Sequence, residues 1–530
     1  MLRSVAIAVM LGALAATARA QPLSPYASAG EQQAAMTDGR VTSEQLVRAY
    51  LERIERIDRA GPKLNAVIAL NPHAVDDARR LDAERRAGQV RGPLHGVPVL
   101  LKDNIESRES GPTTAGSLAL TANVAAQDAP IVQRLVEAGA VILGKTNLSE
   151  WANFRSRQSI SGWSAVGGLV RNPYSLDRSA CGSSSGSGAG IAAGLAAVAL
   201  GTETDGSVTC PAAMNGIVGL KPTVGLVSRT GIAPISPEQD TAGPMTRTVA
   251  DAAALLTVIA GADPADPATA EADAKRANYL AALDRGALKG ARIGVWRPNS
   301  GRSRQMDAVF DAALQVLRDQ GAVLVDVAGP DAKTTGRIDT LEGDCLRIEF
   351  KAAIDAYLAA TPPAVKTRSL ADLIAFNAAE PRELALFGQD IFVSAESMPP
   401  ITDAGYLAKR AEATTLARRA IDDMLAKDDL AAVVAPSGGP ASIVDPVNGG
   451  RFFGSPSTPP AVSGYPHLTV PAGYASGLPI GISFLGPAWS EARLLGLGYA
   501  FEQASHARRE PEFMPSVAVR PEIGQAFDPQ

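Results

Sequence analysis

The sequence has 530 residues, of which 46% are hydrophobic and 20% are charged, and its formal net charge is -5. This is the composition of an ordinary globular protein, and it excludes a wholly disordered or collagen-like chain. The near balance of 50 basic and 55 acidic residues argues against nucleic-acid binding through bulk charge, and four histidines and three cysteines are too few for a zinc finger or a multi-histidine metal site.

The N-terminus has the pattern of a secretory signal peptide. A short basic start precedes an apolar run over 5–16, which is too short to span a bilayer comfortably and is followed by a small-x-small triplet ending at Ala20. We therefore expect residues 1–20 to be removed and residues 21–530 to function in the periplasm or outside the cell. A membrane anchor is the alternative interpretation. After cleavage, no other run is long and apolar enough to predict membrane association.

Downstream, the sequence predicts helices and strands in alternation. Apolar residues at helical spacing predict a helix over 42–58, with Thr42 as its N-cap and Gln45 three residues later. The further elements predicted are a helix over 74–88, a strand over 97–101, a helix over 129–138, a buried strand over 140–143, a helix packed on every side over 186–200, a surface segment over 262–290, a mostly helical segment over 300–430 and short strands such as 467–471. This pattern, without repeats or low-complexity linkers, predicts one large α/β domain.

Residues 139–146 match the letters of a phosphate-binding P-loop. A P-loop needs a flexible loop whose backbone N–H groups wrap a phosphate. The intervening residues 141–143 are apolar and β-branched or leucine, which predicts a strand instead. The match therefore does not predict nucleotide binding.

Residues 182–186 match the G-x-S-x-G nucleophile elbow of α/β-hydrolases, centred on Ser184. Such an enzyme also needs an acid and then a histidine downstream, and Asp445 and His467 are available. No oxyanion segment of the HGGG type is present, and a helix-capping serine and glycine loop explains the same letters. An esterase acting through Ser184 and His467 stays as one alternative function.

A third constellation combines Lys102, a serine cluster over 183–185 and a loop over 201–207. The loop can present successive backbone N–H groups around Ser207, as an oxyanion hole requires. A serine hydroxyl needs a base, and a lysine serves when burial lowers its pKa enough to make it neutral. Lys102 follows an apolar run and has that setting. A structural ion pair with Asp103 is the alternative interpretation.

Together these residues lie in six ordered blocks that resemble the amidase signature family. The blocks cover 96–105, 144–151, 181–188, 201–207, 216–223 and 240–251. The resemblance runs from about residue 30 to 260 and from about 430 to 510, and it is closest to secreted bacterial peptide amidases. It implies a mixed twisted β-sheet core covered by helices on both faces, with the motifs in a core over about 90–255 and a helical substrate-pocket insertion over about 300–430.

The family uses a Ser–cis-Ser–Lys triad and an acyl-enzyme. The resemblance implies that Ser207 is the nucleophile, Ser183 the cis-serine and Lys102 the base, with a cis peptide bond between Gly182 and Ser183. The oxyanion is expected to bind the backbone N–H groups of Thr204, Asp205, Gly206 and Ser207. Supporting roles are expected for Ser184 and Asp240, and substrate-pocket roles for Trp151 and Asn153. No metal and no organic cofactor is implied.

Two features near the serines call for separate interpretation, and the peptide-amidase branch is similar at the first of them. Asp205 stands where many family members have a second glycine, and we interpret it as a residue that shapes the substrate pocket. Cys181 and Cys210 flank the serine segments, and the favoured interpretation is that they are small buried fillers. A disulfide between them is the open alternative.

The function predicted is hydrolysis of C-terminal peptide amides by a monomer whose partner is a small-molecule or peptide amide, not nucleic acid. A general amidase for aryl, aliphatic or oligoamide substrates is one alternative. A component of a tRNA-dependent amidotransferase assembly, of the A type, is another, and the signal peptide argues against it because such an assembly is cytosolic.

Overall fold

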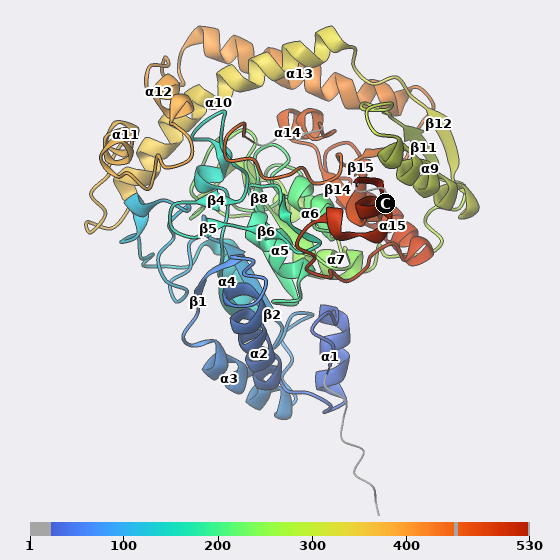
Figure 1. Cartoon of the computed structure of the whole chain (residues 1–530), viewed down its shortest axis with the longest axis horizontal. Helices are drawn as coiled ribbons and strands as arrows, with labels where there is room; N and C mark the ends of the chain where they lie inside the picture. The colour runs from blue at the N-terminus through green and yellow to red at the C-terminus, as the bar shows by residue number, and fades with distance from the viewer. Residues whose placement is uncertain (1–22, 450–453, 528–530) are drawn as a thin grey trace, which may run out of the picture.

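The described residues of the computed structural model, 23–449 and 454–527, fold around one large mixed sheet (Figure 1). In order across the sheet, its strands are β1 (Val67–Leu70), β3 (Val141–Thr146), β2 (Pro98–Lys102), β8 (Val198–Glu203), β10 (Thr241–Thr246), β9 (Val218–Lys221), β14 (His467–Ala475), β15 (Leu478–Leu485), β13 (Ala432–Pro436), β11 (Arg292–Val295) and β12 (Val323–Asp326). The predicted signal peptide lies outside the described residues.

The sheet mixes parallel and antiparallel pairs. The strands β3, β2 and β8 are parallel, as are β13, β11 and β12, whereas the strands between β8 and β13 pair antiparallel. Two short hairpins, β4 (Trp163–Ser164) with β5 (Gly168–Leu169) and β6 (Arg171–Asn172) with β7 (Ser175–Ser179), lie outside it. This arrangement confirms the predicted mixed α/β sheet.

Both faces of the sheet are buried, and the central strands β2, β3, β8, β9 and β10 are buried at every position. In β2, Val99 and Leu101 belong to one hydrophobic cluster and Leu100 to another, because successive side chains of a strand point to opposite faces. The helices α4, α7, α9 and α15 contribute to the first cluster, and α3, α5 and α6 to the second.

The described helices have the following bounds: α1 (Ala29–Thr37), α2 (Ser43–Arg53), α3 (Ala74–Arg86), α4 (Pro130–Glu137), α5 (Ser185–Ala192), α6 (Thr209–Met214), α7 (Val249–Ile259), α8 (Ala272–Lys275), α9 (Arg304–Asp319), α10 (Ala332–Ala360), α11 (Leu370–Ala379), α12 (Asp390–Glu396), α13 (Ala404–Ala426), α14 (Thr458–Ser463), α15 (Glu491–Ser505) and α16 (Pro521–Phe527). The long helices α10 and α13 pack against each other along one edge of the molecule, with α11 and α12 at one end of the pair (Figure 1). Among the described residues, no helix has the length and apolar character that a bilayer crossing requires.

The predicted N-terminus of α2 is confirmed, whereas the predicted extent of the helix that contains α5 is wrong. Thr42 caps α2 and forms the predicted capping box with Gln45. The helix predicted over 186–200 ends at Ala192, and β8 begins at Val198. Gly194 has φ +70°, which terminates the helix, and an uninterrupted apolar run does not distinguish a buried helix from a buried strand.

Candidate active site

Lys102 is the last residue of β2, and its side chain is completely buried. Its Nζ lies 2.8 Å from Ser183 Oγ, 2.8 Å from Thr202 Oγ1 and 3.2 Å from the Thr202 carbonyl oxygen. Burial lowers the pKa of Lys102 to about 7, although the charges of Asp240 and Glu203 act in the opposite direction. Near neutral pH, a large fraction of this lysine is therefore an uncharged amine that can accept a proton.

The ion pair considered between Lys102 and Asp103 is not formed. Asp103 instead pairs with Lys145, whose Nζ lies 3.0 Å from Asp103 Oδ1, and both side chains are buried. Lys145 is the lysine of the P-loop-like motif, and it lies within β3. The strand geometry of this segment excludes a phosphate-wrapping loop there, and Lys145 serves to neutralise a buried carboxylate.

The serine segment is held tightly against β8 and the loop that follows it. The Gly182–Ser183 peptide bond is cis, as the resemblance implies. The backbone N–H of Ser184 donates to the Ser207 carbonyl oxygen at 3.1 Å, and Ser184 Oγ bonds both the N–H and the carbonyl of Thr202 at 3.1 Å. Ser184 thus fixes the position of Ser183 relative to Ser207 and uses its hydroxyl for that purpose.

His467 does not contact Ser184, so these two residues do not form the catalytic triad of an α/β-hydrolase. His467 lies in β14, where its Nε2 is 2.6 Å from Ser483 Oγ. Burial, followed by the charge of Lys221, lowers the pKa of His467 to about 3. Asp445 accepts hydrogen bonds from the backbone of its own turn, at 2.9 Å from the N–H of Val447.

The loop from Glu203 to Ser207 is shaped by two carboxylates. Glu203 Oε2 accepts the backbone N–H of Val208 at 2.7 Å, and Asp240 Oδ1 accepts the hydroxyl of Thr204 at 2.5 Å. Asp240 Oδ2 also accepts two backbone N–H groups of the segment before it, at 2.7 and 2.9 Å. These bonds position the backbone around Ser207, which is 7% exposed.

A cavity of about 440 Å³ opens beside this loop. Its walls include Gly182, Asp205, Ser207, Asn153 and Glu342. The serine segment, the 203–207 loop and the helical segment thus meet at one space next to a serine, a lysine and a row of backbone amides. Among the described residues, no group of three or more metal-ligating side chains is found. This geometry suits attack by a serine on a carbonyl group.

A family model described as Amidase matches residues 45–495. The chain belongs to the amidase family. It is an amide hydrolase, as predicted.

The solved peptide amidase of Stenotrophomonas maltophilia is 51% identical, with a TM-score of 0.87 over 92% of this chain and 99% of that one. A probable amidase of Arabidopsis thaliana is 41% identical over 91% of this chain and 90% of its own length. The A-type component of the glutamyl-tRNA(Gln) amidotransferase of Moorella thermoacetica is 33% identical over 92% of this chain and 98% of its own length.

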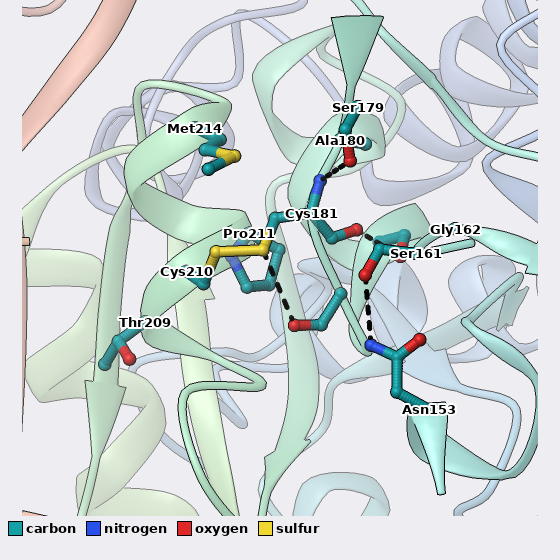
Figure 2. Close-up of a disulfide and its surroundings, with 12 residues drawn as sticks. Asn153, Ser161, Gly162, Ser179, Ala180, Cys181, Thr209, Cys210, Pro211 and Met214 are labelled. Carbon is teal, nitrogen blue, oxygen red and sulfur yellow. Dashed lines mark hydrogen bonds between the residues drawn. A yellow bond between two sulfur atoms is a disulfide. The ribbon is translucent and has the colours of Figure 1, made fainter. Parts of the chain in front are cut away.

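In this amidase, Cys181 and Cys210 form a disulfide, so the favoured interpretation as unpaired fillers is wrong (Figure 2). The Cα atoms of the two cysteines are 6.0 Å apart. The bond ties the residue two positions before Ser183 to α6, which begins just after Ser207, and both cysteines line the cavity. The pairing brings together segments that only the fold makes adjacent. The third cysteine, Cys345, is buried and unpaired.

The two predicted pocket residues have different positions in the amidase. Asn153 lines the cavity, and its Nδ2 donates to Ser161 Oγ at 3.1 Å (Figure 2). Trp151 is packed in a hydrophobic cluster, with its ring 6.1 Å from that of Phe392. Sequence reasoning missed Glu342, because nothing in the helical pattern of α10 marks it as a cavity residue.

Proposed function

We propose that this amidase hydrolyses the C-terminal amides of peptides, with Ser207 as nucleophile and with Ser183 and Lys102 as its proton relay. The observation that carries the proposal is the buried Lys102, whose lowered pKa and contact with Ser183 suit a neutral base. The similarity to a peptide amidase over nearly the whole chain supports the peptide part of the proposal.

In the proposed reaction, Lys102 takes a proton from Ser183 while Ser183 takes one from Ser207. The Ser207 oxygen bonds to the amide carbon, and the carbonyl oxygen becomes an oxyanion bound by the N–H groups of residues 204–207. The C–N bond then breaks, and the relay returns its proton to the departing ammonia. Water attacks the resulting ester by the same route, which releases the acid and restores the Ser207 hydroxyl.

Export is part of the proposal. The leader over 1–20 supports a mature enzyme in the periplasm or outside the cell, and a monomer acting on a small or peptide amide needs no further chain. The similarity to an amidotransferase component favours a second candidate, an ammonia-supplying member of an assembly. The two candidates differ in whether the isolated chain turns over, which size-exclusion chromatography coupled to an ammonia assay measures.

The test is a panel of peptide amides, simple aliphatic amides and anilides, scored for released ammonia or amine. We expect the peptide amides to have the highest kcat/KM. Ser207→Ala should abolish turnover, whereas the matched control His467→Ala should retain it, because His467 bonds to Ser483 and not to Ser184 or Ser207. A Ser207→Ala variant with wild-type turnover would overturn the assigned nucleophile. Equal rates for all amides would overturn the assigned substrate.

A further inference from the structure

Two carboxyl side chains from distant parts of the sequence line the cavity beside Ser207. Asp205 precedes Ser207 by two residues, and Glu342 comes from α10 and is 8% exposed. Asp205 Oδ2 accepts the hydroxyl of Thr458 at 2.7 Å, whereas Asp205 Oδ1 is buried without a hydrogen-bond partner among the described residues. We call Asp205 and Glu342 the acidic pair.

Among the described residues, neither carboxyl of the acidic pair has a Lys or Arg within ion-pair distance, although the charge of Arg410 acts on Glu342 and lowers its pKa in part. The neighbour of Glu342 is the neutral amide of Gln239, whose Nε2 donates to Glu342 Oε1 at 2.7 Å. Arg410 donates to the other end of that amide at 2.9 Å, but its charge is paired with Glu349 at 2.6 Å. Arg410 therefore acts on Glu342 without a direct ion pair, and the charge of Asp205 acts on the cavity.

Asp205 of the acidic pair keeps its negative charge at the pH where the proposed base is active. Burial raises the pKa of Asp205 to about 6, so this carboxyl is ionised at pH 8. Burial, and then the charge of Asp205, raise the pKa of Glu342 well above its ordinary value, so Asp205 is the carboxyl that supplies the charge. Glu203 and Asp339 add negative charge near Asp205. Lys102, with a pKa of about 7, is mostly uncharged at pH 8 and offsets little of this field.

Hydrolysis of an amide produces a negatively charged carboxylate, and the charge of the cavity acts on this product. The neutral carboxamide becomes a carboxylate at the same position, next to the N–H groups that stabilise an oxyanion. Such N–H groups also bind a carboxylate, so a site with no opposing charge would hold its product. Two like charges a few ångströms apart in a partly buried site repel strongly.

We propose that Asp205 discriminates the neutral amide substrate from its carboxylate product and expels the product by charge repulsion, with Glu342 as its carboxyl neighbour in the cavity wall. Asp205 is thus a specificity-determining residue whose side chain takes no part in proton transfer. The proposal rests on amide hydrolysis by this chain and does not depend on the peptide as substrate. It also predicts that peptides with a free C-terminal carboxylate bind poorly in the same position.

The test compares, at pH 8, the inhibition constant of a product acid with the KM of its amide, for example N-acetylphenylalanine and N-acetylphenylalaninamide. We expect Asp205→Asn to bind the acid at least about tenfold more tightly relative to the amide. Glu342→Gln should change this ratio less, because Glu342 holds its proton more tightly than Asp205. The matched control is Asp344→Asn, which removes the same charge from α10 at a residue paired with Lys409 at 2.7 Å.

The ratio compares two constants of the same variant, so a general loss of activity does not by itself change it. An unchanged ratio in Asp205→Asn overturns the proposal, and so does an equal change in the Asp344→Asn control. If N-acetylphenylalaninamide is not cleaved, the pair used is the best amide of the substrate panel and its acid. A failure of the peptide assignment, or of the prediction for Ser207→Ala, can therefore be distinguished from a failure of this inference.

Discussion

The ionisation of Lys102 predicts how amide hydrolysis by this enzyme depends on pH. The proposed relay needs the uncharged amine, and burial lowers the pKa of this lysine from 10.5 to about 7. Because the neutral form is populated above the pKa, activity should rise with pH through 7. With a single ionisation at that value, the neutral fraction grows roughly tenfold between pH 6 and pH 8.

The assay is the initial rate of ammonia release from an uncharged peptide amide, measured from pH 5.5 to pH 8.5 at constant ionic strength. Below KM, this rate reports kcat/KM and hence ionisations of the free enzyme. Asp205 also titrates, with a pKa of about 6. The Asp205→Asn variant should therefore keep a midpoint near 7, which separates the lysine from the carboxyl.

Substitution of the lysine supplies the control for this profile. Lys102→Met should lose about 10²–10⁴-fold in kcat/KM, the ordinary contribution of a general base, and the remaining rate should not follow the same ionisation. Lys102→Arg should be equally impaired throughout the range, because a guanidinium does not lose its proton. A flat profile between pH 6 and pH 8, or a Lys102→Met variant with wild-type activity, would refute the assignment of Lys102 as the base.

The remaining predictions concern the disulfide and the buried histidine. The Cys181–Cys210 bond spans a sequence separation of 29 residues, and closing a loop of this length stabilises a fold by about 3–4 kcal/mol. The double substitution of both cysteines by alanine should lower the free energy of unfolding in urea by about that amount, whereas Cys345→Ala should not match it, and equal losses would contradict the role of the bond. His467→Gln should keep at least a tenth of the ammonia-releasing activity, since this ring is uncharged and bonded to Ser483. A loss of about 10³-fold or more without unfolding would instead favour a histidine base.

Local order along the chain was predictable because it depends on neighbouring residues. Thr42 and Gln45 form their capping box within one helical turn, and the apolar run before Lys102 forms a strand buried on both faces. The motif blocks identified the family and its serine and lysine positions, since these residue types occur in a specific order. The same approach failed over 186–200, where an unbroken apolar run fits a helix and a strand equally well.

The sequence by itself determined the α/β class, the family and the residues proposed for the chemistry, because these are encoded in short segments with specific spacing. Only the tertiary structure decided which distant groups share a space. It pairs Cys181 with Cys210, directs Lys145 to Asp103, and places Glu342 of α10 in the cavity with Asp205. These contacts depend on chain folding over tens to hundreds of residues, and the pKa of Lys102 depends on the burial that follows from it. The spacing of residues along the sequence gives neither these contacts nor the burial that sets the pKa of Lys102.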